Sequence, residues 1–68
     1  MLLSEEQRTV AAALRRLPQR QREAVVLRYY LDLSEEETAQ VMGVAKGTVK
    51  SATHRALAAV GKILREES

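Results

Sequence analysis

Hydrophobic residues recur along the chain at spacings of three and four, and no segment alternates between apolar and polar residues with a period of two. The first such segment begins at Ser4, which stands three residues before Gln7 in the spacing of a capping box. Its apolar residues lie on one helical face: Val10, Ala13, Leu14 and Leu17. Pro18 ends the segment, because proline cannot donate a hydrogen bond within a helix. The pattern predicts a helix over residues 4–17.

Three further helices are predicted over residues 19–32, 34–42 and 46–66. Ser34 and Glu37 repeat the capping-box spacing, and Gly43 permits the left-handed conformation that ends helices. The 19–32 helix is apolar on more than one side, which fits a central helix packed on two faces, a surface for a partner protein, or both. The residues we assign to that partner surface are Val25, Val26, Tyr29 and Tyr30.

The length of 68 residues allows at most one small domain, which we take to span 1–68. A domain this short buries about 60% of the surface that its unfolded chain exposes, so an enclosed active site is not expected. The absence of cysteine excludes disulfides, thiolate metal sites and a cysteine nucleophile. We therefore predict an all-α, small four-helix domain that is not an enzyme and holds no metal or cofactor.

The net charge of +2 conceals an uneven distribution of charge. Residues 43–65 contain no acid and five bases, Lys46, Lys50, Arg55, Lys62 and Arg65, which give this span a charge of +5. Such a stripe is either a solvated helix face or the electrostatic footprint of a nucleic-acid site. The acidic run Glu35–Glu37 begins a helix, where carboxylates oppose the positive end of the helix dipole.

The spacing around the third helix is that of a helix-turn-helix. Ala39 is small where two helices cross, Gly43 takes the turn, and Val44 and Val49 pack the second helix onto the first. The helical wheel places an inward sector on the last helix at Val49, Thr53, Ala56 and Val60. The early residues of its outward side and flanks are our candidate DNA-binding set: Lys46, Gly47, Thr48, Lys50, Ser51, His54 and Arg55.

Each member of this set has a chemical role that suits DNA. Arg55 is able to bind a guanine edge with two hydrogen bonds or to hold a phosphate. Lys46 and Lys50 suit phosphates, because a mobile ammonium makes point contacts, whereas the hydroxyls of Thr48 and Ser51 suit either target. Gly47 permits close approach of the backbone to DNA, or is simply tolerated there. Three roles remain open for His54: a contact with DNA, a solvated surface position without a function, and a response to pH.

Three stretches of the chain together resemble a known family. They are Leu17-Pro18-x-x-x-Arg22-Glu23-Ala24-x-x-Leu27-Arg28-Tyr29, then Ser34-Glu35-x-Glu37-Thr38-Ala39, then Gly43-Val44-x-x-Gly47-Thr48-Val49-Lys50-Ser51. In this pattern the chain resembles region 4 of bacterial sigma-70-family sigma factors of the extracytoplasmic-function (ECF) type. The resemblance covers about residues 17–57.

The resemblance implies that the helix-turn-helix binds the −35 element of double-stranded promoter DNA. It also implies that the apolar surface around the first three helices docks on the flap of the RNA polymerase β subunit, and that an anti-sigma protein regulates the domain. A working sigma factor needs a further region for the −10 element, which nothing in these 68 residues resembles. We therefore expect the chain to be one domain of a longer protein.

Two positions depart from the family's pattern. Ala45 stands where the family often has serine as the N-cap of the recognition helix, and alanine forgoes a cap worth roughly 0.5–2 kcal/mol. The start of that helix is thus expected to fray or to be completed on DNA. Ala52 stands where the family often has arginine, which removes one phosphate or base contact.

Two other functions fit the sequence less well. A LuxR-type DNA-binding effector domain shares the four-helix arrangement and the Thr-Val-Lys motif, but Leu17-Pro18, Tyr29-Tyr30 and Gly47 favour the sigma type. A helical protein-interaction module without DNA binding is disfavoured by the +5 span. No segment approaches the ~20 apolar residues of a membrane helix, and the first residues lack the basic and apolar regions of a signal peptide. We therefore expect a cytoplasmic protein.

Overall fold

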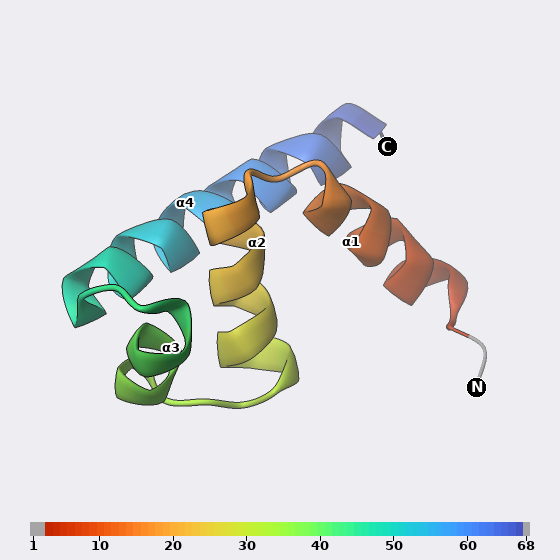
Figure 1. The fold of residues 1–68 in the computed structure, drawn as a ribbon. Coiled ribbons are helices and arrows are strands. Elements are labelled where there is room, and N and C mark those ends of the chain that lie inside the picture. Colours follow the sequence, from red (N-terminus) through yellow and green to blue (C-terminus); the bar gives the residue numbers. More distant parts are fainter. Residues whose placement is uncertain (1–2, 68) are drawn as a thin grey trace.

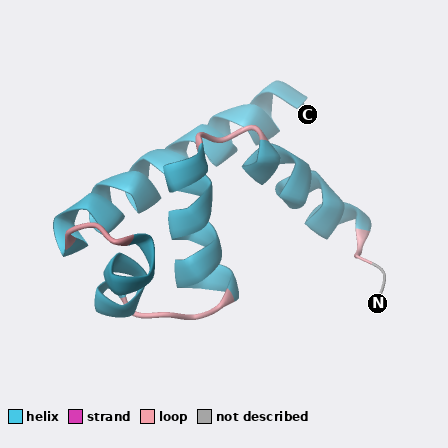
Figure 2. Cartoon of the chain, viewed as in Figure 1, coloured by secondary structure: helices cyan, strands magenta, loops and turns pink. Residues whose placement is uncertain are grey.

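The computed structural model describes residues 3–67, and within them the chain forms helices joined by short loops, without any strand (Figure 2). The helices are α1 (Glu5–Arg15), α2 (Gln19–Val25), α3 (Glu35–Met42) and α4 (Lys46–Glu67). A π-helical segment, η1 (Val26–Tyr30), continues α2. The prediction of a small all-α domain with a long last helix is confirmed.

Both predicted capping boxes are present, because the side chains of Ser4 and Ser34 each accept a hydrogen bond from the backbone three residues on. The predicted bounds agree with the observed ones to within two residues at every helix end, and two differences are instructive. The first helix ends at Arg15 rather than at residue 17, and the second changes from α to π geometry at Val26. In η1 the backbone N–H of Leu31 donates to the carbonyl of Val26, five residues back, at 3.0 Å. This wider turn, of a kind often found at functional sites, leaves no mark in the apolar spacing.

Helix α4 is the axis of the molecule, because each of the other three helices contacts it (Figure 1). The helix α3 lies beside the N-terminal half of α4, α1 beside its C-terminal half, and α2 crosses it between them. The Cα atoms extend over 35 × 28 × 15 Å, so the molecule is thin in one direction. This arrangement leaves one whole side of α4 uncovered.

The hydrophobic core lies where α1 and α2 meet α4. Its buried members are Leu14, Leu17, Val25 and Ala56, with Val10, Ala59, Val60 and Ile63 packed around them. Burial of a Val or Leu side chain contributes about 1.5–3 kcal/mol. The predicted inward sector of α4 is confirmed for Val49 and Ala56, which are fully buried, while Thr53 and Val60 are half-buried.

Both ends of α4 carry an ion pair to another part of the chain. Arg16, which caps α1, lies 3.2 Å from the carboxylate of Glu67. At the other end, Lys46 lies 3.6 Å from the carboxylate of Glu36 in α3. Both pairs are exposed and so contribute little to stability.

None of the helices within residues 3–67 has the length and apolarity needed to cross a membrane.

Candidate nucleic-acid interface

The turn between α3 and α4 has the geometry predicted for a helix-turn-helix. Gly43 adopts a left-handed conformation, with φ 68° and ψ 36°, and its N–H donates to the carbonyl of Ala39. The N–H of Val44 donates to the same carbonyl at 3.1 Å. Ala39 is buried and Val49 fully so, as expected for the contact between the two helices. The turn therefore sets α4 across α3 with its outer side free.

All seven predicted DNA-binding residues are exposed on the N-terminal half of α4. The buried residues of the same stretch, Val49 and Ala52, lie on the opposite side of the helix. The structure thus brings the predicted set onto one accessible surface. We call this surface the outer face of α4; it consists of Lys46, Gly47, Thr48, Lys50, Ser51, His54 and Arg55.

The structure places Ala52 on the inner side of α4. Ala52 is 9% exposed and packs toward the interior of the domain. Position 52 is therefore not on the outer face of α4 in this chain, and the loss of a DNA contact there stays a prediction. An arginine at this position would have to run along the surface of α4 to bring its guanidinium into solvent.

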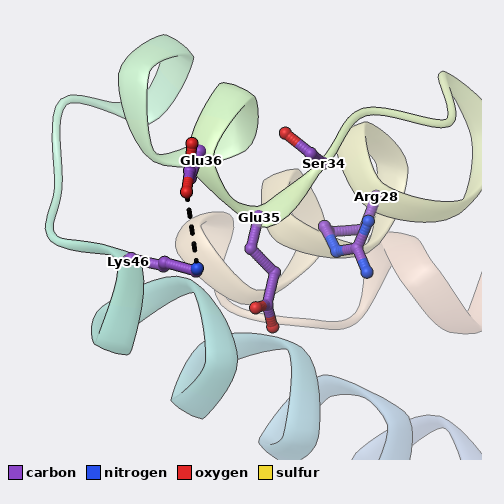
Figure 3. Close-up of a pocket in the computed structure, with 5 residues that line it drawn as sticks. All are labelled: Arg28, Ser34, Glu35, Glu36 and Lys46. Atoms are coloured by element: carbon purple, nitrogen blue, oxygen red, sulfur yellow. Dashed lines mark ion pairs between the residues drawn. The ribbon is translucent and has the colours of Figure 1, made fainter.

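A first hollow of about 480 Å³ lies between the starts of α3 and α4 (Figure 3). It is lined by Arg28, Ser34, Glu35, Glu36 and Lys46. In Figure 3 the side chain of Glu35 lies between those of Arg28 and Lys46 and extends toward α4. The same view shows the ion pair between Lys46 and Glu36. Two cations and two carboxylates therefore share one edge of the candidate interface.

A second hollow of about 370 Å³ adjoins the outer face of α4. It is lined by Arg28, Tyr29, Glu35, Lys50, Thr53, His54 and Leu57. Arg28 and Glu35 therefore line both hollows, and Arg28 comes from η1 rather than from the helix-turn-helix. Sequence reasoning missed Arg28 as a member of the basic surface, because only the tertiary fold places it beside Lys50 and His54.

The guanidinium of Arg28 is held in place from two sides. It donates a hydrogen bond to the backbone carbonyl of Leu33, and it lies over the ring of Tyr29, 5.9 Å from the ring centroid. A guanidinium has five N–H donors, so donors remain beyond the one bonded to Leu33 on a side chain that lines both hollows. Arg28 thus adds a fixed cation to the mobile lysines of α4.

Two small residues on the outer face have constrained local chemistry. The hydroxyl of Ser51 donates to the carbonyl of Gly47 at 3.1 Å, so its lone pairs rather than its proton remain for a partner. A Cβ atom built at Gly47 would meet nothing within 4 Å. Glycine is thus not required at position 47 by packing within the domain.

The predicted partner surface is only partly formed. Val25 is 5% exposed and belongs to the hydrophobic core, so its assignment to a partner surface is wrong. The π turn directs Tyr29 and Tyr30 outward, and they are 54% and 59% exposed. Val26 lines a third hollow of about 290 Å³, whose other lining residues are Arg22, Glu23, Leu27 and Val41. Tyr29 instead lines the second hollow, so the two residues face different sites.

The ionisable groups of the interface hold no metal centre within residues 3–67, because no three His, Asp or Glu side chains converge there. The hydrogen bonds from the backbone and side chain of Ser34 lower the pKa of Glu37, which keeps that carboxyl ionised in the cap of α3. The chemistry available at this face is thus charge, hydrogen bonding and apolar contact.

Comparison with known proteins places the chain in one family. The family described as "Sigma-70, region 4" matches residues 7–60. The RNA polymerase sigma-E factor of Streptomyces antibioticus is 51% identical over 55 residues, which are 81% of this chain and 28% of that protein. The ECF RNA polymerase sigma factor BldN of Streptomyces coelicolor is 39% identical over 56 residues, or 82% of this chain and 21% of that protein. The chain thus spans less than a third of the length of these relatives.

The solved structures give the same result at the level of the fold. A chain in the structure of an RsbN–BldN complex matches 87% of this chain with a TM-score of 0.81 and 36% sequence identity, over 43% of its own length. The chain belongs to the sigma-70 region 4 family.

Proposed function

We propose that this domain binds the −35 element of promoter DNA through the outer face of α4 and thereby takes part in transcription initiation. The observation that carries the proposal is that all seven predicted residues are exposed on the N-terminal half of α4, on the side opposite the buried Val49 and Ala52. Family membership supports a sigma-type function over a LuxR-type one. The N-terminal half of α4 enters the major groove in this proposal, as recognition helices of this motif do.

The side chains divide into those that position the domain and those that recognise bases. Lys46 and Lys50 neutralise phosphates, which supplies affinity without sequence preference. Arg55 and Thr48 contact base edges, because a guanidinium pairs with guanine and a threonine methyl packs on thymine. Arg28 reaches a phosphate that enters the second hollow from outside the helix-turn-helix.

The DNA-binding proposal is tested by fluorescence anisotropy with a −35-type duplex and a scrambled duplex at several salt concentrations. We expect Lys50→Ala and Arg28→Ala to weaken binding to both duplexes and to reduce the salt slope by about one. Arg55→Ala should weaken binding to the matched duplex by about 1–3 kcal/mol and lower the preference for it over the scrambled duplex. Equal affinity of the unchanged domain for the two duplexes would refute sequence-specific binding.

Lys62→Ala is the matched control for these variants. Lys62 is an exposed cation on the same helix, but it lies beyond the outer face defined above, toward the C-terminal end of α4. The variant removes one positive charge without touching either hollow. We expect it to change affinity less than Lys50→Ala does, because screening weakens the action of a charge more than about 8–10 Å away.

We further propose that the third hollow receives the flap of the RNA polymerase β subunit. Val26, Leu27 and the 64% exposed Val41 give this hollow an apolar floor, and Arg22 and Glu23 supply a charged rim. An apolar centre with a polar rim is typical of a protein-binding site. The third hollow shares no residue with the two that border the outer face of α4, which supports simultaneous binding of DNA and polymerase.

A peptide with the sequence of the flap tip tests this second proposal by NMR. We expect it to shift the amide signals of Val26, Leu27 and Val41. Val41→Gln should weaken binding of the peptide. It should not unfold the domain, because Val41 is exposed. Leu57→Gln is the control, since Leu57 is also exposed but lines the second hollow. Signal changes confined to α4 would refute this docking site.

Regulation by an anti-sigma protein is the third part of the proposal. The matched solved structure contains BldN together with RsbN, which supports a protein partner for a domain of this fold. The exposed apolar residues Tyr29, Tyr30 and Leu31 are the surface of this chain that such a partner would cover. Since its proposed binding partner is chromosomal DNA, the domain would act in the cytoplasm. A pull-down from the source bacterium that recovers neither polymerase subunits nor a small regulator would count against the proposal.

A further inference from the structure

We propose that Glu35 and Glu36 act as a built-in electrostatic brake on DNA binding, which lowers the affinity of the domain for every duplex. The proposal rests on the DNA-binding function proposed above and deepens it. Both residues lie in the first turn of α3, at the edge of the surface that faces DNA. Their carboxylates compete there with phosphates for the same cations.

The first observation is the ion pair between Glu36 and Lys46, with the carboxylate oxygen and the ammonium nitrogen 3.6 Å apart. Lys46 is the first residue of α4, so its charge stands at the positive end of that helix dipole. Glu36 is the anion that offsets this unfavourable position in the free domain. A phosphate that binds Lys46 must therefore replace Glu36 or share the ammonium with it.

The second observation is the position of Glu35. Its side chain lines both hollows beside the outer face, together with Arg28 and Lys46 in the first and with Arg28, Lys50 and His54 in the second. Figure 3 shows it between Arg28 and Lys46. A phosphate drawn to Arg28, Lys46 or Lys50 thus approaches the carboxylate of Glu35, and like charges repel.

Glu35 and Glu36 make no capping hydrogen bond of their own, so at the start of α3 they act only through the helix dipole. In α3 the cap is made by Ser34 and Glu37, whose side chains exchange hydrogen bonds with each other's backbone. In α1 the same cap is made by Ser4 and Gln7, and the first two helical positions between them again carry a pair of acids, Glu5 and Glu6. The start of α1 lies at the opposite side of the molecule from α3 and the start of α4, whose residues line the hollows (Figure 1). Glu5 is therefore a control for Glu35 at the same helical position, and Glu6 for Glu36.

The experiment compares Glu35→Gln, Glu36→Gln, Glu5→Gln and Glu6→Gln by fluorescence anisotropy with matched and scrambled duplexes from low to physiological salt. We expect each α3 variant to bind both duplexes about three- to tenfold more tightly at low salt, with little change in their ratio. Glu36→Gln should also steepen the salt dependence by about one counterion, because Lys46 becomes free to bind a phosphate. The α1 variants should change affinity less than twofold.

A Lys46→Ala background isolates the ion pair, since Glu36→Gln should then tighten binding less than it does in the unchanged domain. Urea unfolding of all variants checks that each is folded under the binding conditions. Unchanged or weaker binding by the α3 variants would overturn the brake, and so would an equal increase in all four, which would reflect net charge alone. If the unchanged domain does not distinguish the two duplexes, the proposed function fails, whereas the brake is still decided on the scrambled duplex.

Discussion

Ser34 and Glu37 are joined by two reciprocal hydrogen bonds that begin the helix-turn-helix. The hydroxyl of Ser34 accepts from the N–H of Glu37 at 3.0 Å, and the carboxylate of Glu37 accepts from the N–H of Ser34 at 2.9 Å. These bonds satisfy two backbone donors that helix geometry leaves unpaired. They therefore stabilise the first turn of α3.

The stability of the domain should fall in acid partly through Glu37. Its pKa is lowered from 4.5 in the folded state by the hydrogen bonds with Ser34, so its contribution is present above pH 4.5 and is lost as the pH falls through the lowered value. Glu37→Gln keeps a side-chain oxygen for the cap, as Gln7 does in α1, and should flatten this part of the pH dependence. Urea unfolding between pH 2.5 and pH 7 measures the effect.

Gln7→Glu is the reciprocal variant, because it places a carboxylate in the otherwise identical cap of α1. It should add acid sensitivity where Glu37→Gln removes it. Parallel pH profiles for Glu37→Gln and the unchanged domain would contradict the assignment.

Ala45→Ser should stabilise the start of α4. The carbonyl of Ala45 already accepts from the N–H groups of Thr48 and Val49, at 3.0 and 3.2 Å, whereas its side chain has no oxygen to offer them. A serine cap is worth about 0.5–2 kcal/mol in the free energy of unfolding. Hydrogen exchange should slow at the first amides of α4. Ala58→Ser, at an exposed position within the helix, is the control and should lower stability slightly.

Gly47→Ala and Gly43→Ala should change stability in opposite directions. Alanine at position 47 meets nothing within 4 Å and should stabilise α4 by about 0.5–1 kcal/mol. Alanine at position 43 is forced into a left-handed conformation, φ 68°, at a cost of about 1–2 kcal/mol. Thermal unfolding measures both. If Gly47→Ala is more stable but binds DNA less tightly, close approach of the backbone to DNA explains the glycine; unchanged DNA affinity removes that role.

Thr38→Val should stabilise the domain although it removes a polar group. Thr38 is fully buried in α3 and its hydroxyl oxygen has no hydrogen-bond partner. Valine has the same shape, so the change removes the desolvation penalty of the hydroxyl, about 1 kcal/mol or more. Thr38→Ser is the contrasting variant, because it keeps the hydroxyl and loses the methyl group. Chemical denaturation should rank them Val above Thr above Ser, and the reverse order would reveal a partner for the hydroxyl.

Local signals in the sequence were sufficient to place the four helices to within two residues and to find the turn, but not to find the π segment. The serines at positions 4 and 34, the apolar spacing and Gly43 act within a few residues of themselves, so their effects were predictable without the fold. The same holds for the outer face of α4, because helical periodicity alone separates Val49 from Lys50. The exposure predicted for that face agrees with the structure at every assigned residue.

Tertiary packing decided what periodicity leaves open. The 19–32 helix is apolar on several sides, and only the contact with α1 and α4 placed Val25 in the core while the π turn left Tyr29 and Tyr30 outside. The burial of Ala52 likewise depends on where α4 is covered by its neighbours. Arg28 and Glu35 come from different elements, and the fold alone brings both beside Lys50. The interaction between charged side chains on such a surface depends on their distance in space, and the order of residues along the chain does not give that distance.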